Sequence, residues 1–113
     1  MEQPRLFVYG TLRRGSPNQY ADLLQANAQY VGNARMRGRL HQIGSYPGAV
    51  PSDQPGEWVS GELYHLEDPT ILATLDDYEG SEFERILTKV SLDDGRELET
   101  WVYVFRGKTQ AFQ

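Results

Sequence analysis

Leu6-Phe7-Val8-Tyr9-Gly10-Thr11-Leu12-Arg13 joins a short apolar run to an abrupt break at a glycine. The apolar, partly β-branched residues at 6–8 predict a short buried strand. Gly10 permits backbone angles that other residues avoid and lets the main chain approach a ligand closely. A strand that ends in this way exposes backbone N–H groups that can bind a carboxylate or a developing oxyanion. An ordinary glycine turn explains the same residues, and the spacing alone favours that simpler interpretation.

The residues after this turn exclude two nucleotide-binding loops. Gly10 and Gly15 have the spacing of a P-loop, but Ser16-Pro17 stands where that motif requires Lys followed by Ser or Thr. The dinucleotide-binding fingerprint also fails, because no third glycine follows at the required offset.

Composition narrows the class of protein. A length of 113 residues predicts a single domain over 1–113, and 39% hydrophobic with 24% charged residues predicts a folded one. The net charge of -5 argues against a nucleic-acid surface, and the absence of cysteine excludes disulfides and cysteine zinc sites. Because there is neither a signal peptide nor an apolar run of bilayer length, we expect a cytoplasmic protein without membrane contact.

Periodicity predicts five strands and two helices. Ser16 and Pro17 resemble an N-cap and a first-turn proline, so a helix is expected after them, and Asp68-Pro69 predicts a second helix that ends near Gly80. Alternating patterns predict strands at 6–8, 30–40, 58–66, 86–92 and 98–105, the last two joined by a hairpin at 93–96.

The strand over 30–40 alternates between two kinds of residue. Its even-numbered positions are apolar or glycine and should face the core, whereas arginines dominate the other face. Glycines on the inner face indicate tight bending, as in a small curled sheet or barrel. Residues 44–51 contain two prolines and two glycines and are predicted to be a loop with Tyr46 at its tip. Since the helices and strands do not alternate regularly, the fold class is α+β.

Ionisable residues concentrate between Asp76 and Arg85. Most such acidic runs are solvated faces, and the calcium-loop pattern is absent. Glu79 differs because it ends a helix whose other face is apolar; if the chain turns inward there, burial would raise its pKa and fit it for acid or base catalysis. His41 and His65 lie too far apart in the sequence to suggest a metal site, and Ser16 and Ser81 lack a histidine partner at motif spacing.

Two segments together resemble the γ-glutamylcyclotransferase-like family, which includes γ-glutamylaminecyclotransferase and the AIG2-like proteins. They are Tyr9-Gly10-Thr11-Leu12-Arg13 and Leu75-Asp76-Asp77-Tyr78-Glu79-Gly80, the second followed by Phe83-Glu84-Arg85. Residues 46–50, 59–64 and 101–104 fit the same family pattern in order, so the resemblance spans nearly the whole chain.

This resemblance implies a small mixed β-barrel-like sheet with flanking helices and a cofactor-independent transferase or lyase-type cyclisation. A small γ-glutamyl compound would yield 5-oxoproline and a free amine. The resemblance assigns Glu79 as the catalytic residue and Tyr9, Gly10, Thr11 and Leu12 as the substrate-binding turn. We add Tyr46 and Tyr103 as pocket-lining candidates, and we expect a monomer without bound metal.

Two other functions stay open at this point. A non-catalytic module could bind an amino-acid-like carboxylate at the Tyr9–Leu12 turn, although Glu79 would then repel the ligand. A metal-dependent hydrolase built on Asp76, Asp77 and Glu79 is least favoured, because adjacent aspartates at a helix end point in different directions.

Overall fold

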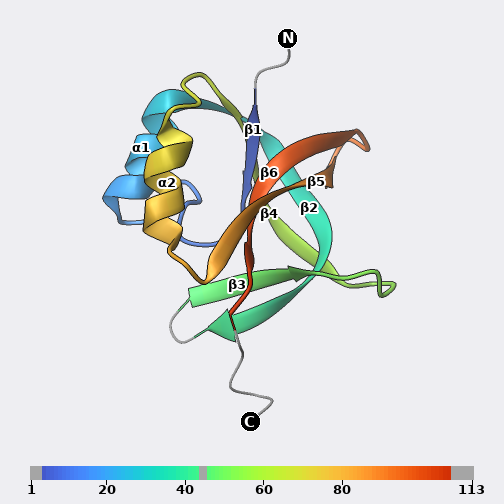
Figure 1. Ribbon diagram of the computed structural model, residues 1–113. Coiled ribbons are helices and arrows are strands. Elements are labelled where there is room, and N and C mark those ends of the chain that lie inside the picture. Colours follow the sequence, from blue (N-terminus) through green and yellow to red (C-terminus); the bar gives the residue numbers. More distant parts are fainter. Residues whose placement is uncertain (1–3, 44–45, 108–113) are drawn as a thin grey trace.

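The computed structural model describes residues 4–43 and 46–107, with the side chains of Ile43 and Tyr46 also left undescribed (Figure 1). Within these residues the chain forms β1 (Arg5–Val8), α1 (Gln19–Asn27), β2 (Ala28–Ile43), β3 (Tyr46–Pro51), β4 (Trp58–Leu66), α2 (Ile71–Glu79), β5 (Phe83–Leu92) and β6 (Glu97–Phe105). Neither helix is long and apolar enough to cross a membrane.

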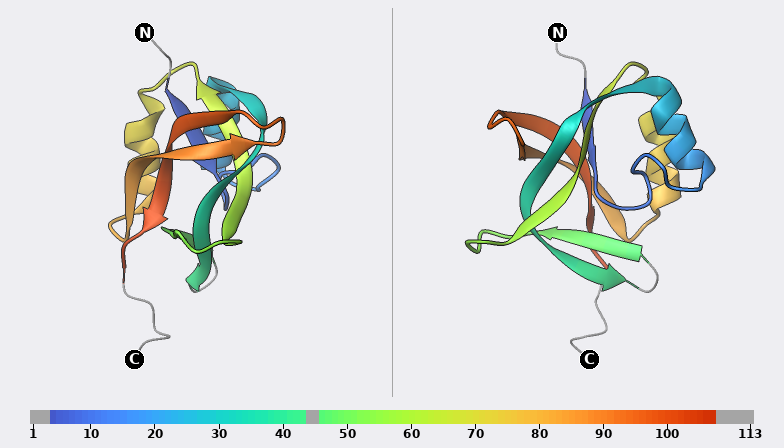
Figure 2. Two further views of the ribbon diagram at one scale, coloured as in Figure 1. Left: turned by 90° about the vertical axis from the view of Figure 1, so that its right-hand side faces the viewer. Right: turned by 180° about the vertical axis from the view of Figure 1, so that it is seen from behind.

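Five of the strands close into a barrel. Their order is β2-β4-β1-β6-β5, and pairing between β2 and β5 completes the circle. β1 runs antiparallel to β4 but parallel to β6, so the barrel is mixed. β3 pairs only with the second half of β2, outside the barrel, and the two helices lie side by side on one flank (Figures 1 and 2). The predicted α+β class, a mixed barrel-like sheet with flanking helices, is confirmed.

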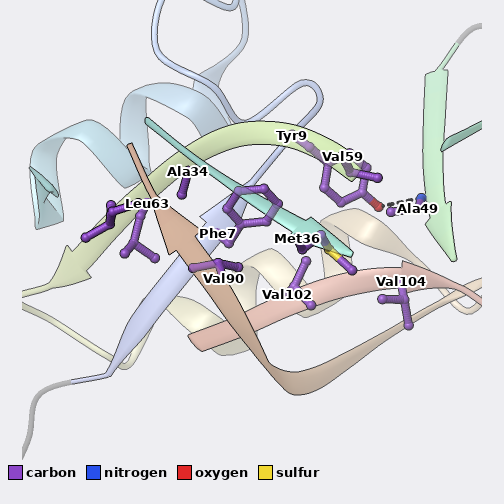
Figure 3. Close-up of a cluster of buried hydrophobic side chains, with 11 residues drawn as sticks. Phe7, Tyr9, Ala34, Met36, Ala49, Val59, Leu63, Val90, Val102 and Val104 are labelled. Atoms are coloured by element: carbon purple, nitrogen blue, oxygen red, sulfur yellow. Dashed lines mark hydrogen bonds between the residues drawn. The ribbon is translucent and has the colours of Figure 1, made fainter. Parts of the chain in front are cut away.

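β1 separates two apolar clusters because successive side chains of a strand point to opposite faces. Phe7 points into the barrel, where it packs with Met36, Leu63, Val90 and Val102 (Figure 3). Leu6 and Val8 face the helices and pack against buried residues of α1 and α2, among them Leu24, Ile71, Leu72 and Leu75. The same short strand therefore holds the barrel interior and the helical layer together, and it delivers the residues after Val8 to the boundary between them.

β2 curves around the barrel, as its glycines predict. Ala34, Met36 and Gly38 are buried on the inner face, and a Cβ at Gly38 would lie only 2.9 Å from the Val50 carbonyl oxygen. The inward prediction is wrong for Tyr30 and Leu40, which are 37% and 51% exposed. A register shift between Tyr30 and Gly32 turns the first outward, and Leu40 lies beyond the barrel, where β2 pairs only with β3.

Three local predictions need correction. Residues 46–51 are not a loop but strand β3, so the described chain has six strands rather than five. The N-cap of α1 is Asn18, whose side chain accepts from the Ala21 N–H, whereas Ser16 and Pro17 belong to the preceding turn. α2 begins at Ile71, because Asp68 caps the Thr70 N–H in a tight turn before the helix.

The C-terminal boundary of α2 is as predicted. Gly80 follows the last helical residue with a φ of 86°, a left-handed value that favours glycine, and its N–H donates to the Asp76 carbonyl. The hairpin between β5 and β6 is also confirmed, although β5 begins three residues earlier than predicted, at Phe83. α2 thus ends abruptly, and its last residue is Glu79.

Candidate active site

A cavity of about 410 Å³ lies where β1 ends, between the barrel and the C-terminal turn of α2. Its lining combines the turn Tyr9–Leu12, Tyr78 and Glu79 from α2, and Tyr103 from β6. The other lining residues are apolar: Phe7, Val8, Pro47 and Phe83. Five of the six predicted substrate-binding residues and the predicted catalytic residue therefore surround one cavity. The sixth, Tyr46, has a side chain outside the described part of the structure, although its neighbour Pro47 is in the lining.

The turn after β1 is held by hydrogen bonds at its ends. The Arg13 N–H donates to the Gly10 carbonyl at 3.2 Å, and the Asn18 side-chain amide donates to the Thr11 carbonyl at 2.8 Å. In contrast, the backbone N–H groups of Gly10, Thr11 and Leu12 have no acceptor among residues 4–43 and 46–107. The carbonyls of Gly10 and Thr11 are thus satisfied by the protein, whereas three backbone donors of cavity-lining residues have no acceptor within the described chain.

Gly10 allows β3 to approach this turn. A Cβ at position 10 would lie 3.2 Å from the Pro47 side chain, closer than nearly all such contacts in proteins. The absence of a side chain therefore keeps the wall formed by β3 close to the wall formed by the turn.

Glu79 is the acidic residue that lines the cavity, and its carboxyl has no charged partner within the described residues. Its side chain is partly buried, and no hydrogen bond or ion pair to it is found within the described residues. Burial raises the pKa of Glu79 from the ordinary 4.5 to about 7. Near neutral pH this carboxyl therefore exists in both protonation states, as an acid and base catalyst requires.

The hydroxyl groups of the two cavity tyrosines bind protein atoms. Tyr9 donates to the Tyr103 carbonyl at 2.6 Å and accepts from the Ala49 N–H at 3.0 Å, the second bond being drawn in Figure 3. Tyr103 donates its own hydroxyl proton to Asp76 Oδ1 at 2.7 Å. Burial raises the pKa of Tyr9 to about 12, and burial together with the Asp76 carboxylate raises the pKa of Tyr103 far above its usual range. Both hydroxyls stay protonated, and what these residues present to the cavity is mainly their rings.

Two features of the site were not predicted from sequence. The sequence predicts Tyr78 only as part of the apolar face of its helix, but Tyr78 lines the cavity. Its hydroxyl forms a hydrogen bond with Thr11 Oγ1 at 2.7 Å, and its ring stacks on that of Tyr20 with ring centres 4.2 Å apart. Asp76, expected to be one of several solvated acids, instead binds Arg85 through both carboxylate oxygens at 2.8 and 3.0 Å. The sequence signal for the second feature is that Asp76 and Arg85 both belong to the segments that carry the family resemblance.

The acid cluster shows no metal-binding arrangement. Asp76 is committed to Arg85 and Tyr103, and Asp77 is exposed to solvent. No group of three His, Asp or Glu residues that could hold a metal ion occurs in the part of the chain that the structure describes.

The raised pKa of Glu79 predicts a pH dependence of stability. Because the unfolded chain loses this proton near pH 4.5 and the folded chain only near pH 7, the stability that Glu79 contributes is complete below pH 4.5 and is lost as the pH rises through 7. The loss between pH 5 and 8 is about 2 kcal/mol, allowing for partial exposure. Because Glu79→Gln cannot titrate, the free energy of unfolding of this variant minus that of the wild type should rise by about 2 kcal/mol from pH 5 to pH 8. Urea titrations at the two pH values measure this difference.

Other groups near the cavity do not obscure that measurement. The hydrogen bonds from Arg85 lower the pKa of Asp76, so Asp76 stays ionised throughout the range. A stability difference that is the same at pH 5 and pH 8 would mean that Glu79 titrates at its ordinary pKa and is not buried.

Comparison with known proteins identifies the family. The family model described as gamma-glutamyl cyclotransferase, AIG2-like, matches residues 6–112. The chain belongs to this family. It is 34% identical over 105 residues to the gamma-glutamylcyclotransferase family protein YtfP of Escherichia coli, covering 90% of this chain and 82% of that protein.

A second relative and a solved structure agree with this assignment. The gamma-glutamylaminecyclotransferase of Rattus norvegicus is 36% identical over 85 residues, which cover 66% of this chain and 54% of that enzyme. The crystal structure of an AIG2-like protein from Mus musculus superimposes with a TM-score of 0.80 at 27% identity, covering 98% of this chain and 82% of that chain. The barrel and its two helices are therefore the fold of this family.

Proposed function

We propose that this protein is a γ-glutamyl cyclotransferase that converts a γ-glutamyl amine or amide to 5-oxoproline and a free amine, with Glu79 as general acid and base. One arrangement carries the proposal: a partly buried carboxyl with a pKa of about 7 lines the same cavity as Gly10, Thr11 and Leu12, whose backbone N–H groups have no acceptor within residues 4–43 and 46–107. Membership of the family supports the class of reaction.

The first step needs a base. The nucleophile is the α-amino group of the substrate, which is an ammonium at neutral pH and must lose a proton before it can attack. The ionised form of Glu79 accepts that proton and becomes a carboxylic acid. Because the nucleophile belongs to the same molecule as the carbonyl, the site only has to hold a folded conformer, and the entropy cost of bringing two molecules together is absent.

The second step needs an oxyanion site and an acid. As the amine nitrogen bonds to the γ-carbonyl carbon, negative charge develops on the carbonyl oxygen, and the backbone N–H groups of Gly10, Thr11 and Leu12 are suited to receive it. Glu79 then returns its proton to the leaving nitrogen while the original C–N bond breaks. It next accepts the second proton of the attacking nitrogen, which becomes the lactam N–H, and passes that proton to the amine, which departs as an ammonium. One C–N bond forms, another breaks, and neither water nor a redox partner is consumed.

The apolar lining fits a role in holding the substrate. The rings of Tyr9 and Tyr103 and the side chains of Phe7 and Phe83 exclude water from the carboxyl of Glu79, which strengthens the interactions in both steps. We propose that Tyr46, next to Pro47, completes this wall on the β3 side.

The test is product release from a panel of γ-glutamyl compounds with different leaving groups. The panel should include simple γ-glutamyl amines, γ-glutamyl amino acids and γ-glutamyl peptides, with 5-oxoproline and the free amine both quantified. The proposal expects equal amounts of the two products from at least one compound. Saturable binding of these compounds without any product would instead support a non-catalytic binding module.

A further inference from the structure

The two walls of the cavity are joined through Tyr103. Its side chain reaches α2, where the hydroxyl donates to Asp76 Oδ1 at 2.7 Å. Its carbonyl accepts from the Tyr9 hydroxyl at 2.6 Å, and Tyr9 immediately precedes Gly10. Asp76 lies three positions before Glu79 on the same helix, so it shares a helical face with it. One residue of β6 thus connects the helix turn that carries Glu79 to the turn that carries the backbone donors.

Arg85 fixes the helical end of this connection. Its Nε and Nη2 bind Oδ1 and Oδ2 of Asp76 at 2.8 and 3.0 Å, a fork that defines the orientation of the carboxylate as well as its position. The guanidinium also lies over the Trp101 ring at 4.5 Å, so α2 and β6 hold it from two sides. Neither Arg85 nor Asp76 is among the residues that line the cavity.

We propose that Arg85 is a positioning residue for the cyclisation, acting through Asp76 and Tyr103 to hold Glu79 opposite the Gly10 turn. This inference rests on the proposed function. The reason that such a connection is needed is local: Glu79 is the last residue of α2, so only the final turn of the helix can set its place. The apolar contacts of Ile71, Leu72 and Leu75 fix the rest of the helix, whereas Asp76 is the polar anchor of the turn beside the cavity.

The ion pair has a second consequence inside the site. Tyr9 and Tyr103 are the groups whose titration responds to Glu79, and both stay neutral. Of the two aspartates near this end of α2, Asp77 is exposed to solvent, and Asp76 is neutralised by Arg85. Glu79 is therefore left as the unmatched acid of the cavity, and removal of Arg85 would both loosen the helix end and expose an additional negative charge.

The experiment compares kcat and KM of Arg85→Met, Arg85→Lys and Asp76→Asn with the wild type on the best compound of the panel. A displaced Glu79 costs about 10- to 100-fold in kcat, while KM changes by less than about threefold, because the substrate contacts are intact. Arg85→Lys keeps the charge and should recover part of the loss. The double variant Asp76→Asn/Arg85→Met should lose no more than the worse single variant, since the two residues act as one unit.

The matched control is Arg96→Gln. Arg96 also pairs with an aspartate at 2.9 Å, but its pair with Asp94 is exposed in the turn between β5 and β6. This variant should leave kcat unchanged. If the Arg85 variants lose only thermal stability and keep the wild-type kcat per folded molecule, Arg85 has a structural role alone and the proposal is overturned.

Nuclear magnetic resonance separates this inference from the proposed function. In Arg85→Met and Asp76→Asn the backbone amide signals of Gly10 and Thr11 should shift, whereas Arg96→Gln should leave them in place. If the wild type releases no 5-oxoproline, the proposed function has failed and the amide signals alone decide the connection between the walls. Unshifted amide signals in both variants would overturn the proposed connection. If Arg85→Met does not fold, Arg85→Lys and Tyr103→Phe supply the same readout.

Discussion

Replacing Glu79 by glutamine is expected to lower kcat/KM for 5-oxoproline release by about 10²-fold or more. The amide keeps the shape of the side chain but can neither accept the ammonium proton nor return one to the leaving nitrogen. Because the carboxyl makes no hydrogen bond or ion pair within the described residues, the change should leave the cavity wall in place. The measurement is the initial rate at several substrate concentrations, with 5-oxoproline quantified chromatographically.

The matched control for this variant is Asp77→Asn. Asp77 is an exposed carboxylate on the same helix, two residues earlier, and it does not line the cavity. Its replacement should change kcat/KM by less than about twofold, as expected of a surface site. If Glu79→Gln turns over substrate as fast as Asp77→Asn, Glu79 has no part in the chemistry, and the assignment of Glu79 as acid and base is wrong although the activity stands.

Gly61→Ala is expected to destabilise the barrel by about 3 kcal/mol, the largest effect on stability that we predict for a single added methyl group. A Cβ at this position of β4 would clash with the Val8 carbonyl oxygen and would lie 2.8 Å from Cζ of Phe7. The first neighbour is backbone and cannot rotate away, so β1 and β4 would have to separate where they pair. Urea denaturation followed by circular dichroism measures the loss.

Gly32→Ala serves as the control for that substitution. Gly32 lies in the neighbouring barrel strand β2, and its added Cβ would approach only the end of the Leu92 side chain, at 3.4 Å. A flexible leucine can move by the few tenths of an ångström required, so the expected loss is below about 1 kcal/mol. Similar losses for the two variants would show that β1 and β4 can part without cost and that the close approach at Gly61 is unimportant.

Local sequence rules predicted the parts of the fold that depend on near neighbours. Alternation located β4, β5 and β6, and Gly80 marked the end of α2. The rules failed at β3, because Pro47, Gly48 and Pro51 are typical of loops. These residues are accommodated since β3 is an edge strand that pairs with β2 on one side only, so a missing N–H on the open side costs nothing.

The site was predicted through the family resemblance more than through chemistry visible in the sequence. Glu79 and the Gly10 turn were assigned in this way, and the structure gives both a place in one cavity. The state of the tyrosine hydroxyls could not be predicted, because the bond between Tyr9 and the Tyr103 carbonyl exists only where β1 and β6 lie side by side. The pair of Asp76 and Arg85 likewise depends on how α2 packs against β5, which no local pattern encodes.

The parallel pairing of β1 with β6 has a consequence for how the protein is made. Leu6 and Phe7 pair with Trp101 and Val102, so β1 acquires its second neighbour only after β6 has emerged from the ribosome. Until then the barrel cannot close, and contacts this distant in sequence form slowly. Between the synthesis of β1 and that of β6, one edge of β1 therefore lacks its partner, and the cavity, which needs Tyr103 of β6, takes shape only after that interval.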